Sequence, residues 1–259
     1  MKILFMGRKQ VSANLLRFLT KHDHIEIVGV LTDSHLQGSP TTAAAQELGL
    51  PLYTFDTALE AMREGRLKYD LGLSVLYWRK LRDEFLSIPT LGTINFHPAL
   101  LPEYKGTGGY NLAIMDELNE WGNTAHYVDA SIDTGEIIEV DRFPIDAETE
   151  TAQSLERKTM QALEDFARRI ITRAIESKTK LPTTPNIGGR YVSRGEMEAM
   201  KQIHDGDNIE KKIRAFWFPP YDGAYVEING QKYTLINRQL LEEIAPKGST
   251  SLFAGKTNA

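Results

Sequence analysis

Two polar segments of the chain carry side chains suited to chemistry at a carbonyl group. In the first, Asn95 and His97 stand two residues apart in the short run Ile94-Asn-Phe-His. If this run is a strand, its period of two places both side chains on one face. The amide of Asn95 offers N–H donors to an oxygen that becomes negative, and an imidazole exchanges a proton near neutral pH. A loop-capping asparagine and a buried structural histidine are the commoner roles of a single such pair.

The second segment adds a carboxylate. Residues 122–128 and 136–138 have the pattern of two strands joined by a polar turn, and Asp133 lies in that turn, followed by Thr134 and Gly135. A carboxylate at this place could reach His97 or a bound water. Asp-Thr-Gly is weak evidence when taken alone, because aspartate and glycine are frequent in all turns.

The elements that would position these groups alternate between strand and helix. Short apolar runs predict buried strands at residues 1–7, 26–31, 51–55, 69–76 and 93–96. Apolar residues at helical spacing predict helices at 11–19, 42–48 and 58–66. This alternation is typical of an α/β fold with a doubly wound, mostly parallel sheet. Ligands of such sheets bind beyond the carboxyl ends of the strands, which is where Asn95 and His97 stand.

The turn after the first predicted strand carries two cations, Arg8 and Lys9, behind Gly7. Backbone N–H groups at a helix start together with two positive side chains would suit a phosphate. The segment lacks both the G-x-G-x-x-G fingerprint and the Walker lysine motif, so a tight turn with solvated charges explains it equally well.

The overall composition excludes several classes of protein. The chain has 259 residues, of which 41% are hydrophobic and 25% are charged, and it contains no cysteine. A disordered or fibrous chain, disulfides and thiolate metal sites are therefore excluded, and no cluster of residues suggests another metal site. A net charge of −5 gives no support to a nucleic-acid partner. No apolar run of about 18 residues and no signal peptide are present, so we expect a cytoplasmic protein with no membrane contact.

The two polar segments together are recognisable. Asn95-Phe-His97-Pro-Ala-Leu-Leu-Pro-x-Tyr-Lys105-Gly, followed by His126-Tyr-Val-Asp-x-x-Ile-Asp133-Thr-Gly, closely resembles the formyltransferase family that uses 10-formyltetrahydrofolate. The resemblance covers about residues 1–180. It implies that Asn95, His97 and Asp133 are the catalytic trio, that 10-formyltetrahydrofolate is the formyl donor, and that no metal is needed. Relatives often have Tyr-Arg-Gly where this chain has Lys105, which keeps the charge but loses the arginine fork.

The resemblance also implies a mechanism and a folate pocket. An amine attacks the formyl carbon, Asn95 donates to the oxygen that becomes negative, His97 handles the proton of the amine, and Asp133 holds the histidine or passes a proton to the departing folate nitrogen. The pteridine would enter beside the segment after the fourth strand and the loop before the aspartate. The positions concerned are Leu76, Tyr77, Trp78, Arg79, Val128, Asp129, Ala130, Ser131 and Ile132.

Residues 186–259 are expected to form a small C-terminal subdomain after a catalytic domain of residues 1–185. Helices are predicted at about 195–203 and 209–217, and Asn229-Gly230 between two alternating runs predicts a β-hairpin. The aromatic-rich loop at 216–225 resembles the tail of sugar-nucleotide N-formyltransferases. Glycinamide ribonucleotide transformylases stop near residue 185, and methionyl-tRNA formyltransferases carry a longer and more basic C-terminal barrel, so neither is the expected type.

This resemblance implies an acceptor that is an aminodideoxy sugar linked to a nucleotide. The expected substrate is dTDP-4-amino-4,6-dideoxyglucose, used in O-antigen and lipopolysaccharide biosynthesis, although the nucleotide and the position of the amine stay open. The residues expected to bind it are Arg8, Lys9, Lys105, Gly109, Tyr110, Trp217, Phe218 and Tyr221. For Trp217 and Phe218 the alternative is that they simply pack the hairpin onto the core. A homodimer is expected, because relatives of this length are usually dimers and the hairpin exposes apolar residues.

Three alternatives stay open. A formyltetrahydrofolate hydrolase would use the same trio with water as acceptor, a related transferase would use another small amine, and a nucleotide-binding module would have no need of the trio. Folate release measured with and without an aminosugar nucleotide separates them.

Overall fold

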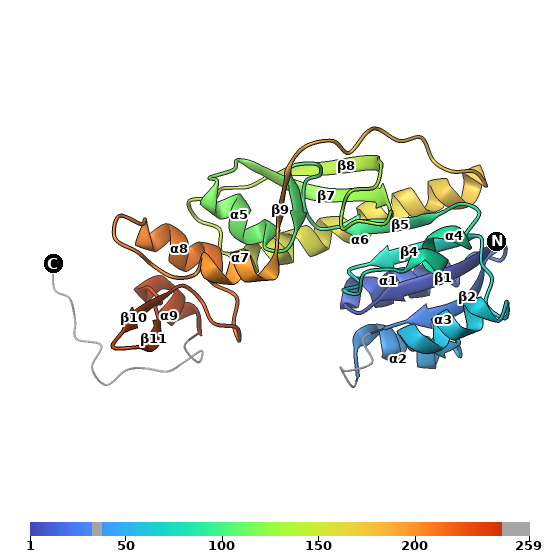
Figure 1. Cartoon of the computed structure of the whole chain (residues 1–259), viewed down its shortest axis with the longest axis horizontal. Coiled ribbons are helices and arrows are strands. Elements are labelled where there is room, and N and C mark those ends of the chain that lie inside the picture. Colours follow the sequence, from blue (N-terminus) through green and yellow to red (C-terminus); the bar gives the residue numbers. More distant parts are fainter. Residues whose placement is uncertain (33–37, 245–259) are drawn as a thin grey trace.

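A seven-stranded sheet lies at the centre of the N-terminal part (Figure 1). The computed structural model describes residues 1–32 and 38–244, so residues 245–259 of the expected subdomain lie outside the described residues. The strands are β1 (Lys2–Gly7), β2 (Glu26–Leu31), β3 (Leu52–Tyr53), β4 (Leu71–Val75), β5 (Thr93–His97), β7 (Glu120–Tyr127) and β8 (Ile137–Pro144). Their order is β3-β2-β1-β4-β5-β7-β8.

The first five strands are parallel, and β7 and β8 continue the sheet in antiparallel register. The predicted doubly wound, mostly parallel α/β sheet is therefore confirmed. Because the chain moves outward from β1 to β3 and then returns to the other side of β1, the sheet has its topological switch point between β1 and β4. Ligand sites of α/β sheets lie beside such a point.

Helices cover both faces of this sheet. Ile3 and Phe5 of β1 pack under α1 (Gln10–Leu19), α2 (Pro40–Glu47) and α6 (Ala152–Ser177). Leu4 and Met6 point the other way and pack under α3 (Phe55–Arg63) and α4 (Asp83–Ser87). Both faces of a parallel strand are buried, which is why its sequence shows a continuous apolar run without alternation.

The long helix α6 is not among the elements predicted from the sequence. It begins at a reciprocal cap between Thr151 and Ser154 and ends where Lys178 adopts a left-handed conformation. Its buried side chains include Leu155, Leu163 and Phe166, which recur at helical spacing. The same helix carries Glu156, whose carboxylate pairs with the ammonium of Lys9.

The C-terminal part is tied to the catalytic part through strand pairing and helix packing. The strand β9 (Arg190–Val192) pairs in parallel with β6 (Tyr104–Gly106), and α8 (Ile209–Phe216) packs against α5 (Gly109–Met115). The helix α7 (Arg194–Ala199) follows β9 directly, and α9 (Arg238–Ile244) ends the described chain. Figure 1 shows these elements beside the end of the sheet that carries α5.

The predicted hairpin is present as β10 (Tyr225–Ile228) and β11 (Gln231–Thr234). Asn229 and Gly230 both have positive φ, at 53° and 77°, which matches the tight turn that this dipeptide favours. The domain boundary near residue 185 stays a prediction. Across residues 1–32 and 38–244, no helix has the length and apolar character needed to cross a membrane.

Candidate active site

A cleft of about 860 Å³ opens at the carboxyl ends of β1, β4 and β5. Most residues expected to bind ligands line it. From the N-terminal part these are Arg8, Lys9, Leu76, Tyr77, Trp78, Asn95, His97, Gly109, Tyr110, Ile132 and Asp133. Phe218 and Tyr221 line it from the C-terminal part. The fold thus brings the predicted trio and most of the predicted ligand contacts into one space.

The amide of Asn95 is held in one orientation by its two neighbours across the sheet. The hydroxyl of Ser74 donates to Asn95 Oδ1 over 2.7 Å, and Asn95 Nδ2 lies 3.0 Å from His126 Nε2. His126 Nδ1 lies 2.8 Å from the carbonyl oxygen of Tyr127, which can only accept, so that nitrogen carries the ring proton and Nε2 accepts from Asn95. One N–H of the amide stays available to the cleft that Asn95 lines.

His97 ends β5 with its ring almost completely buried. Its Nε2 lies 2.9 Å from the carbonyl oxygen of Tyr104, so this nitrogen is the donor and Nδ1 of the neutral ring keeps a lone pair. Nδ1 lies 3.6 Å from Asp133 Oδ2. Burial lowers the pKa of His97 below its ordinary value, and the nearby Asp133 only partly offsets this. His97 is therefore a neutral base at neutral pH.

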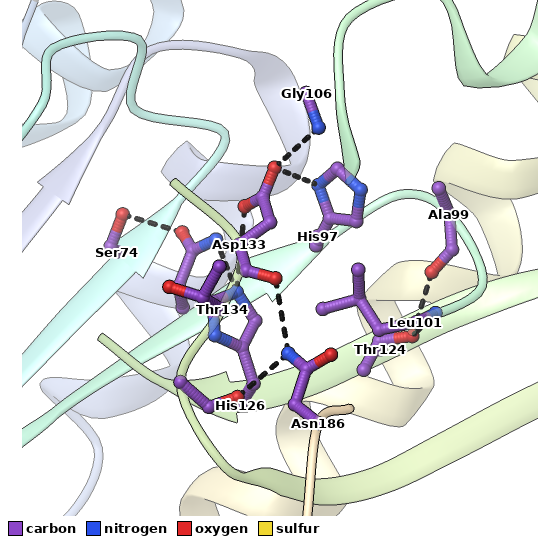
Figure 2. Close-up of polar contacts among 12 residues, drawn as sticks. Ser74, His97, Ala99, Leu101, Gly106, Thr124, His126, Asp133, Thr134 and Asn186 are labelled. Carbon is purple, nitrogen blue, oxygen red and sulfur yellow. Dashed lines mark hydrogen bonds and ion pairs between the residues drawn. The ribbon is translucent and has the colours of Figure 1, made fainter. Parts of the chain in front are cut away.

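Asp133 lies in the turn between β7 and β8, in a left-handed conformation with φ of 55°. The backbone N–H of Gly106 donates to its Oδ2 over 2.9 Å, and His126 Nε2 lies 3.6 Å from its Oδ1 (Figure 2). Burial alone would raise the pKa of Asp133, but the charged form of His97, the charged form of His126 and the Gly106 N–H favour the carboxylate and hold that pKa at about 2. The carboxylate is thus an anion that faces His97.

Gly106 has a backbone that only glycine fits. Its φ is 83°, and a Cβ there would lie 2.4 Å from the carbonyl oxygen of Val192 and 2.8 Å from the ring of Tyr191. The close approach lets β6 pair with β9 while the Gly106 N–H still reaches Asp133. The Tyr-Lys-Gly motif therefore supports two members of the trio through backbone atoms, Tyr104 O for His97 and Gly106 N for Asp133.

These three groups form an arrangement suited to attack on a carbonyl carbon. Asn95 offers a fixed N–H donor to an oxygen that becomes negative, His97 Nδ1 can take a proton, and Asp133 stabilises the imidazolium that results. Each part is already positioned by hydrogen bonds, so little reorganisation is needed when charge develops.

Sequence reasoning missed four residues that position the trio. Ser74 and His126 stand directly beside Asn95 on the neighbouring strands. The carbonyl oxygen of Tyr104 accepts from His97. Asn186 donates to the carbonyl oxygens of Asp133 and Gly135 over 3.0 and 2.8 Å (Figure 2). His126 was part of the recognised motif without a role of its own. Cross-strand neighbours depend on the register between strands, which a single sequence does not contain.

The residues expected around the folate divide into two groups. Leu76, Tyr77, Trp78 and Ile132 line the cleft. Arg79 instead stacks over the rings of Phe55 and Trp78, Val128 packs against the core under α3, and Asp129 binds Ser131 N and Thr134 Oγ1 within its own loop. Ala130 and Ser131 are exposed in that loop. None of the residues in this second group is among those that line the cleft.

The residues expected around the acceptor also divide. Lys9 lines the cleft, but its ammonium is paired with Glu156 of α6. Lys105 lies outside the cleft and donates to the carbonyl oxygen of Gly188 over 2.8 Å. Trp217 is only 8% exposed and packs in the C-terminal core with Ile114 and Phe216, whereas Tyr221 is 67% exposed at the cleft. Of the three aromatic residues predicted in the C-terminal part, Phe218 and Tyr221 line the cleft and Trp217 does not.

Within the described part of the chain, no group of three or more His, Asp or Glu side chains is arranged to hold a metal ion.

Comparisons with known proteins agree on one family. A family model described as formyl transferase matches residues 1–174. The methionyl-tRNA formyltransferase of Lysinibacillus sphaericus is 29% identical over 241 residues, covering 86% of this chain and 74% of that protein. Among solved structures, the N-formyltransferase of Helicobacter canadensis in complex with folinic acid and dTDP-3-aminofucose has a TM-score of 0.70 and 25% identity, covering 90% of this chain and 86% of that one.

A second solved structure is similar to the same extent. WlaRD, a sugar 3N-formyltransferase determined in the presence of dTDP and 5-N-formyl-THF, has a TM-score of 0.69 and 25% identity, covering 90% of this chain and 84% of that one. The names of the relatives thus divide between two acceptors, a sugar and methionyl-tRNA.

Proposed function

We propose that this chain, which belongs to the formyl transferase family, moves the formyl group of 10-formyltetrahydrofolate to the amino group of a nucleotide-linked aminodideoxy sugar. The observation that carries the proposal is the position of the Asn95–His97–Asp133 network, which opens into the same cleft as the half-buried ring of Phe218 and the exposed ring of Tyr221. The solved relative bound to folinic acid and dTDP-3-aminofucose supports both the folate donor and the nucleotide-sugar acceptor of this proposal.

The cleft fits a folate ring. Trp78 and Ile132 line it with 49% and 43% of their surface exposed, and Leu76 and Tyr77 lie beside them. Exposed apolar and aromatic side chains in a cleft favour contact with the flat faces of a ring system. We propose that these four residues, on walls shaped by Arg79, Val128 and Asp129, hold the pteridine. Bound there, the folate supplies an activated formyl group, and the remaining chemistry comes from the protein.

The residues of this chain have three tasks in that reaction. The free N–H of Asn95 donates to the formyl oxygen as negative charge develops on it. The neutral His97 takes the proton of the attacking amine at Nδ1, the nitrogen that Tyr104 leaves unprotonated. Asp133, an anion with a pKa of about 2, then stabilises the charged ring. The proton leaves for the departing folate nitrogen along the same path.

For the acceptor we propose dTDP-4-amino-4,6-dideoxyglucose and a place in O-antigen or lipopolysaccharide synthesis in the cytoplasm. Tyr221 and Phe218 would stack on the base, with Gly109 and Tyr110 beside the sugar. Arg8 and Lys9 stand at the switch point beyond β1, where the sugar end of the acceptor meets the trio. Lys105 would act indirectly, because its ammonium binds the backbone carbonyl of Gly188. Trp217 would also act indirectly, by packing in the core that supports the aromatic loop.

We also propose a homodimer formed through the hairpin and α9. Large apolar side chains are more than one-third exposed there, namely Ile228, Tyr233, Ile236, Leu241 and Ile244. Burial of such side chains against a second copy would remove them from water. Light scattering at micromolar concentration should give the mass of two chains, and a single-chain mass would contradict this proposal.

Methionyl-tRNA is the second candidate acceptor, because the sequence relatives are methionyl-tRNA formyltransferases. The net charge of −5 speaks against a tRNA partner, since such proteins neutralise phosphates with lysine and arginine.

A competition between acceptors tests the proposed function. Tetrahydrofolate release from 10-formyltetrahydrofolate is followed with no acceptor, with dTDP-4-amino-4,6-dideoxyglucose, with its 3-amino isomer, and with methionyl-tRNA. Release that depends on an aminosugar nucleotide supports the proposal. Release that is equally fast without acceptor identifies a hydrolase, and release that needs methionyl-tRNA overturns the sugar assignment.

A further inference from the structure

One face of α7 lines the cleft with side chains that no part of the reaction has used. Arg194, Met197 and Glu198 of α7 line it, and their spacing places them on one helical face. Lys201 lines the cleft from the turn that follows the end of α7 at Ala199. Glu196 lies on another face of the same helix, where its carboxylate accepts from the backbone N–H of Ser193.

The N-terminal end of this face lies near the catalytic centre. Val192 pairs with Gly106, whose N–H binds Asp133, and Arg194 follows Val192 by two residues. Met197 packs against Gly108, where a Cβ would lie 2.7 Å from the Met197 Cγ atom. No ion pair or hydrogen bond of the Arg194 side chain is found within residues 1–32 and 38–244. It is a cation that lines the cleft and has its donors available.

The other end of the face carries a buried ammonium. Lys201 is 7% exposed, and its Nζ lies 2.7 Å from Glu198 Oε2. An ammonium has three N–H donors, and among the described residues Glu198 is the one ion-pair partner of Lys201. Burial of a lysine is costly unless it is paired and its donors are used. The pair therefore presents a donor and an acceptor side by side at the wall of the cleft.

The Glu198–Lys201 pair also lies beside the aromatic loop. The backbone N–H of Tyr225 donates to the carbonyl oxygen of Lys201 over 3.0 Å, and Tyr221 and Asp222, just before it, line the same cleft. Phe218 and Tyr221 are in ring contact, with centroids 6.1 Å apart. Aromatic faces bind any base by stacking, whereas a donor beside an acceptor distinguishes the polar edges of bases.

From the centre outward the cleft thus offers the trio, a free cation, an apolar side chain, and a donor–acceptor pair next to aromatic rings. A rise of about 1.5 Å per residue places Glu198 roughly 6 Å beyond Arg194 along α7, and Lys201 follows in the turn after the helix. A sugar linked to a nucleoside diphosphate has the same sequence of groups, with an amine, a diphosphate, a pentose and a base.

We infer that α7 and the turn after it bind the nucleotide half of the acceptor: Arg194 contacts the diphosphate, and Glu198 with Lys201 reads the polar edge of the base. This inference rests on the proposed nucleotide-sugar acceptor and names the residues that select its nucleotide. Glu198 accepts from an N–H of the base while Lys201 donates to the neighbouring ring oxygen or nitrogen. Stacking on Tyr221 adds affinity for every base.

Inhibition of formyl transfer by three fragments tests the order of groups along α7. The fragments are dTDP, thymidine and inorganic pyrophosphate, and the variants are Arg194→Met, Glu198→Gln and Lys201→Met. Arg194→Met should weaken dTDP and pyrophosphate roughly tenfold and leave thymidine unchanged. Glu198→Gln and Lys201→Met should weaken dTDP and thymidine roughly tenfold and leave pyrophosphate unchanged. Glu196→Gln, on the other face of the helix, is the matched control and should change nothing.

A comparison of dTDP with UDP, CDP and GDP tests base reading. Wild-type protein should prefer one base, and Glu198→Gln and Lys201→Met should each reduce that preference roughly tenfold while the kcat at saturating acceptor is kept. If Lys201→Met does not fold, Glu198→Gln decides alone, because its side chain is 45% exposed and the change keeps its shape.

Each contrary outcome has a definite meaning. If none of the variants changes dTDP inhibition, or if all of them weaken pyrophosphate equally, the inference about α7 is wrong while the proposed function stands. If dTDP, UDP, CDP and GDP all fail to inhibit wild-type protein and an aminosugar nucleotide is no acceptor, the proposed function itself is wrong.

Discussion

The catalytic centre and the C-terminal wall of the cleft are built on different principles. At the centre, Asn95 and His97 project from a sheet strand, and their orientation is set by hydrogen bonds to Ser74, His126 and Tyr104. At the wall, Tyr221 is 67% exposed and lies in the loop between α8 and β10. The difference indicates that hydrogen bonds position the groups of the trio rigidly, whereas the side chains at the wall are exposed and can be changed one at a time.

Trp217→Ala should cause the largest loss, and it should be a loss of stability. Its indole is buried among Ile114, Ile213 and Phe216, and removal of a buried tryptophan typically costs about 3–5 kcal/mol. Urea unfolding measures this directly. If the variant were as stable as wild type and bound the acceptor more weakly, Trp217 would be a ligand contact and not a residue of the C-terminal core.

Asn95→Ala should leave the fold intact and reduce kcat by roughly 10²- to 10³-fold, because one donor to the developing oxyanion is lost. Steady-state formyl transfer and circular dichroism are the two measurements. Ser74→Ala is the control within the same hydrogen-bond network, since it frees the amide without removing it and should cost much less. Equal losses in the two variants would mean that the amide acts through the fold and not through its N–H.

Tyr221→Ala should raise the acceptor KM by roughly ten- to a hundredfold, because stacking of a base on an aromatic ring is worth about 1–3 kcal/mol. Phe218→Ala should have a smaller effect of the same kind, since its ring is less exposed. The KM for the folate and the free energy of unfolding should stay unchanged in both. If neither variant changed the acceptor KM, the aromatic loop would have no part in acceptor binding, and α7 would remain the proposed contact at this wall.

Asp133→Asn should change how stability depends on pH. The folded-state pKa of Asp133, about 2, lies below the ordinary unfolded value of about 3.9. The ionised carboxylate therefore contributes about 2 kcal/mol that is present above pH 4 and is lost as the pH falls towards 2. Between pH 5.5 and 2.5, the free energy of unfolding should fall more in wild type than in the variant. A parallel fall in both proteins would contradict the low pKa.

His126→Leu should reduce kcat roughly tenfold with little change in either KM, because it removes the acceptor that orients the amide of Asn95. His126→Gln offers a carbonyl oxygen at a similar place and should recover part of the loss. If His126→Leu were fully active, or if the glutamine variant recovered nothing while both stayed folded, His126 would have no positioning role.

Patterns within short segments of the sequence determined a large part of this protein. Apolar runs and helical spacing predicted the strands β1, β2 and β4 and the helices α1 and α3, and Asn229-Gly230 predicted the hairpin turn. The spacing of Asn95 and His97 placed both on one strand face, and they do line one cleft. Each of these inferences needs only neighbours along the chain, because backbone conformation and side-chain periodicity are local properties.

The tertiary structure decided which side chains meet. Parallel register put Ser74 beside Asn95, antiparallel register put His126 on its other side, and the pairing of β6 with β9 brought α7 to the cleft. Trp217 and Tyr221 are aromatic residues four positions apart, yet one is buried in a core and the other is exposed at the cleft. Such outcomes depend on burial and register between segments distant in sequence, so they were settled only when the whole chain packed.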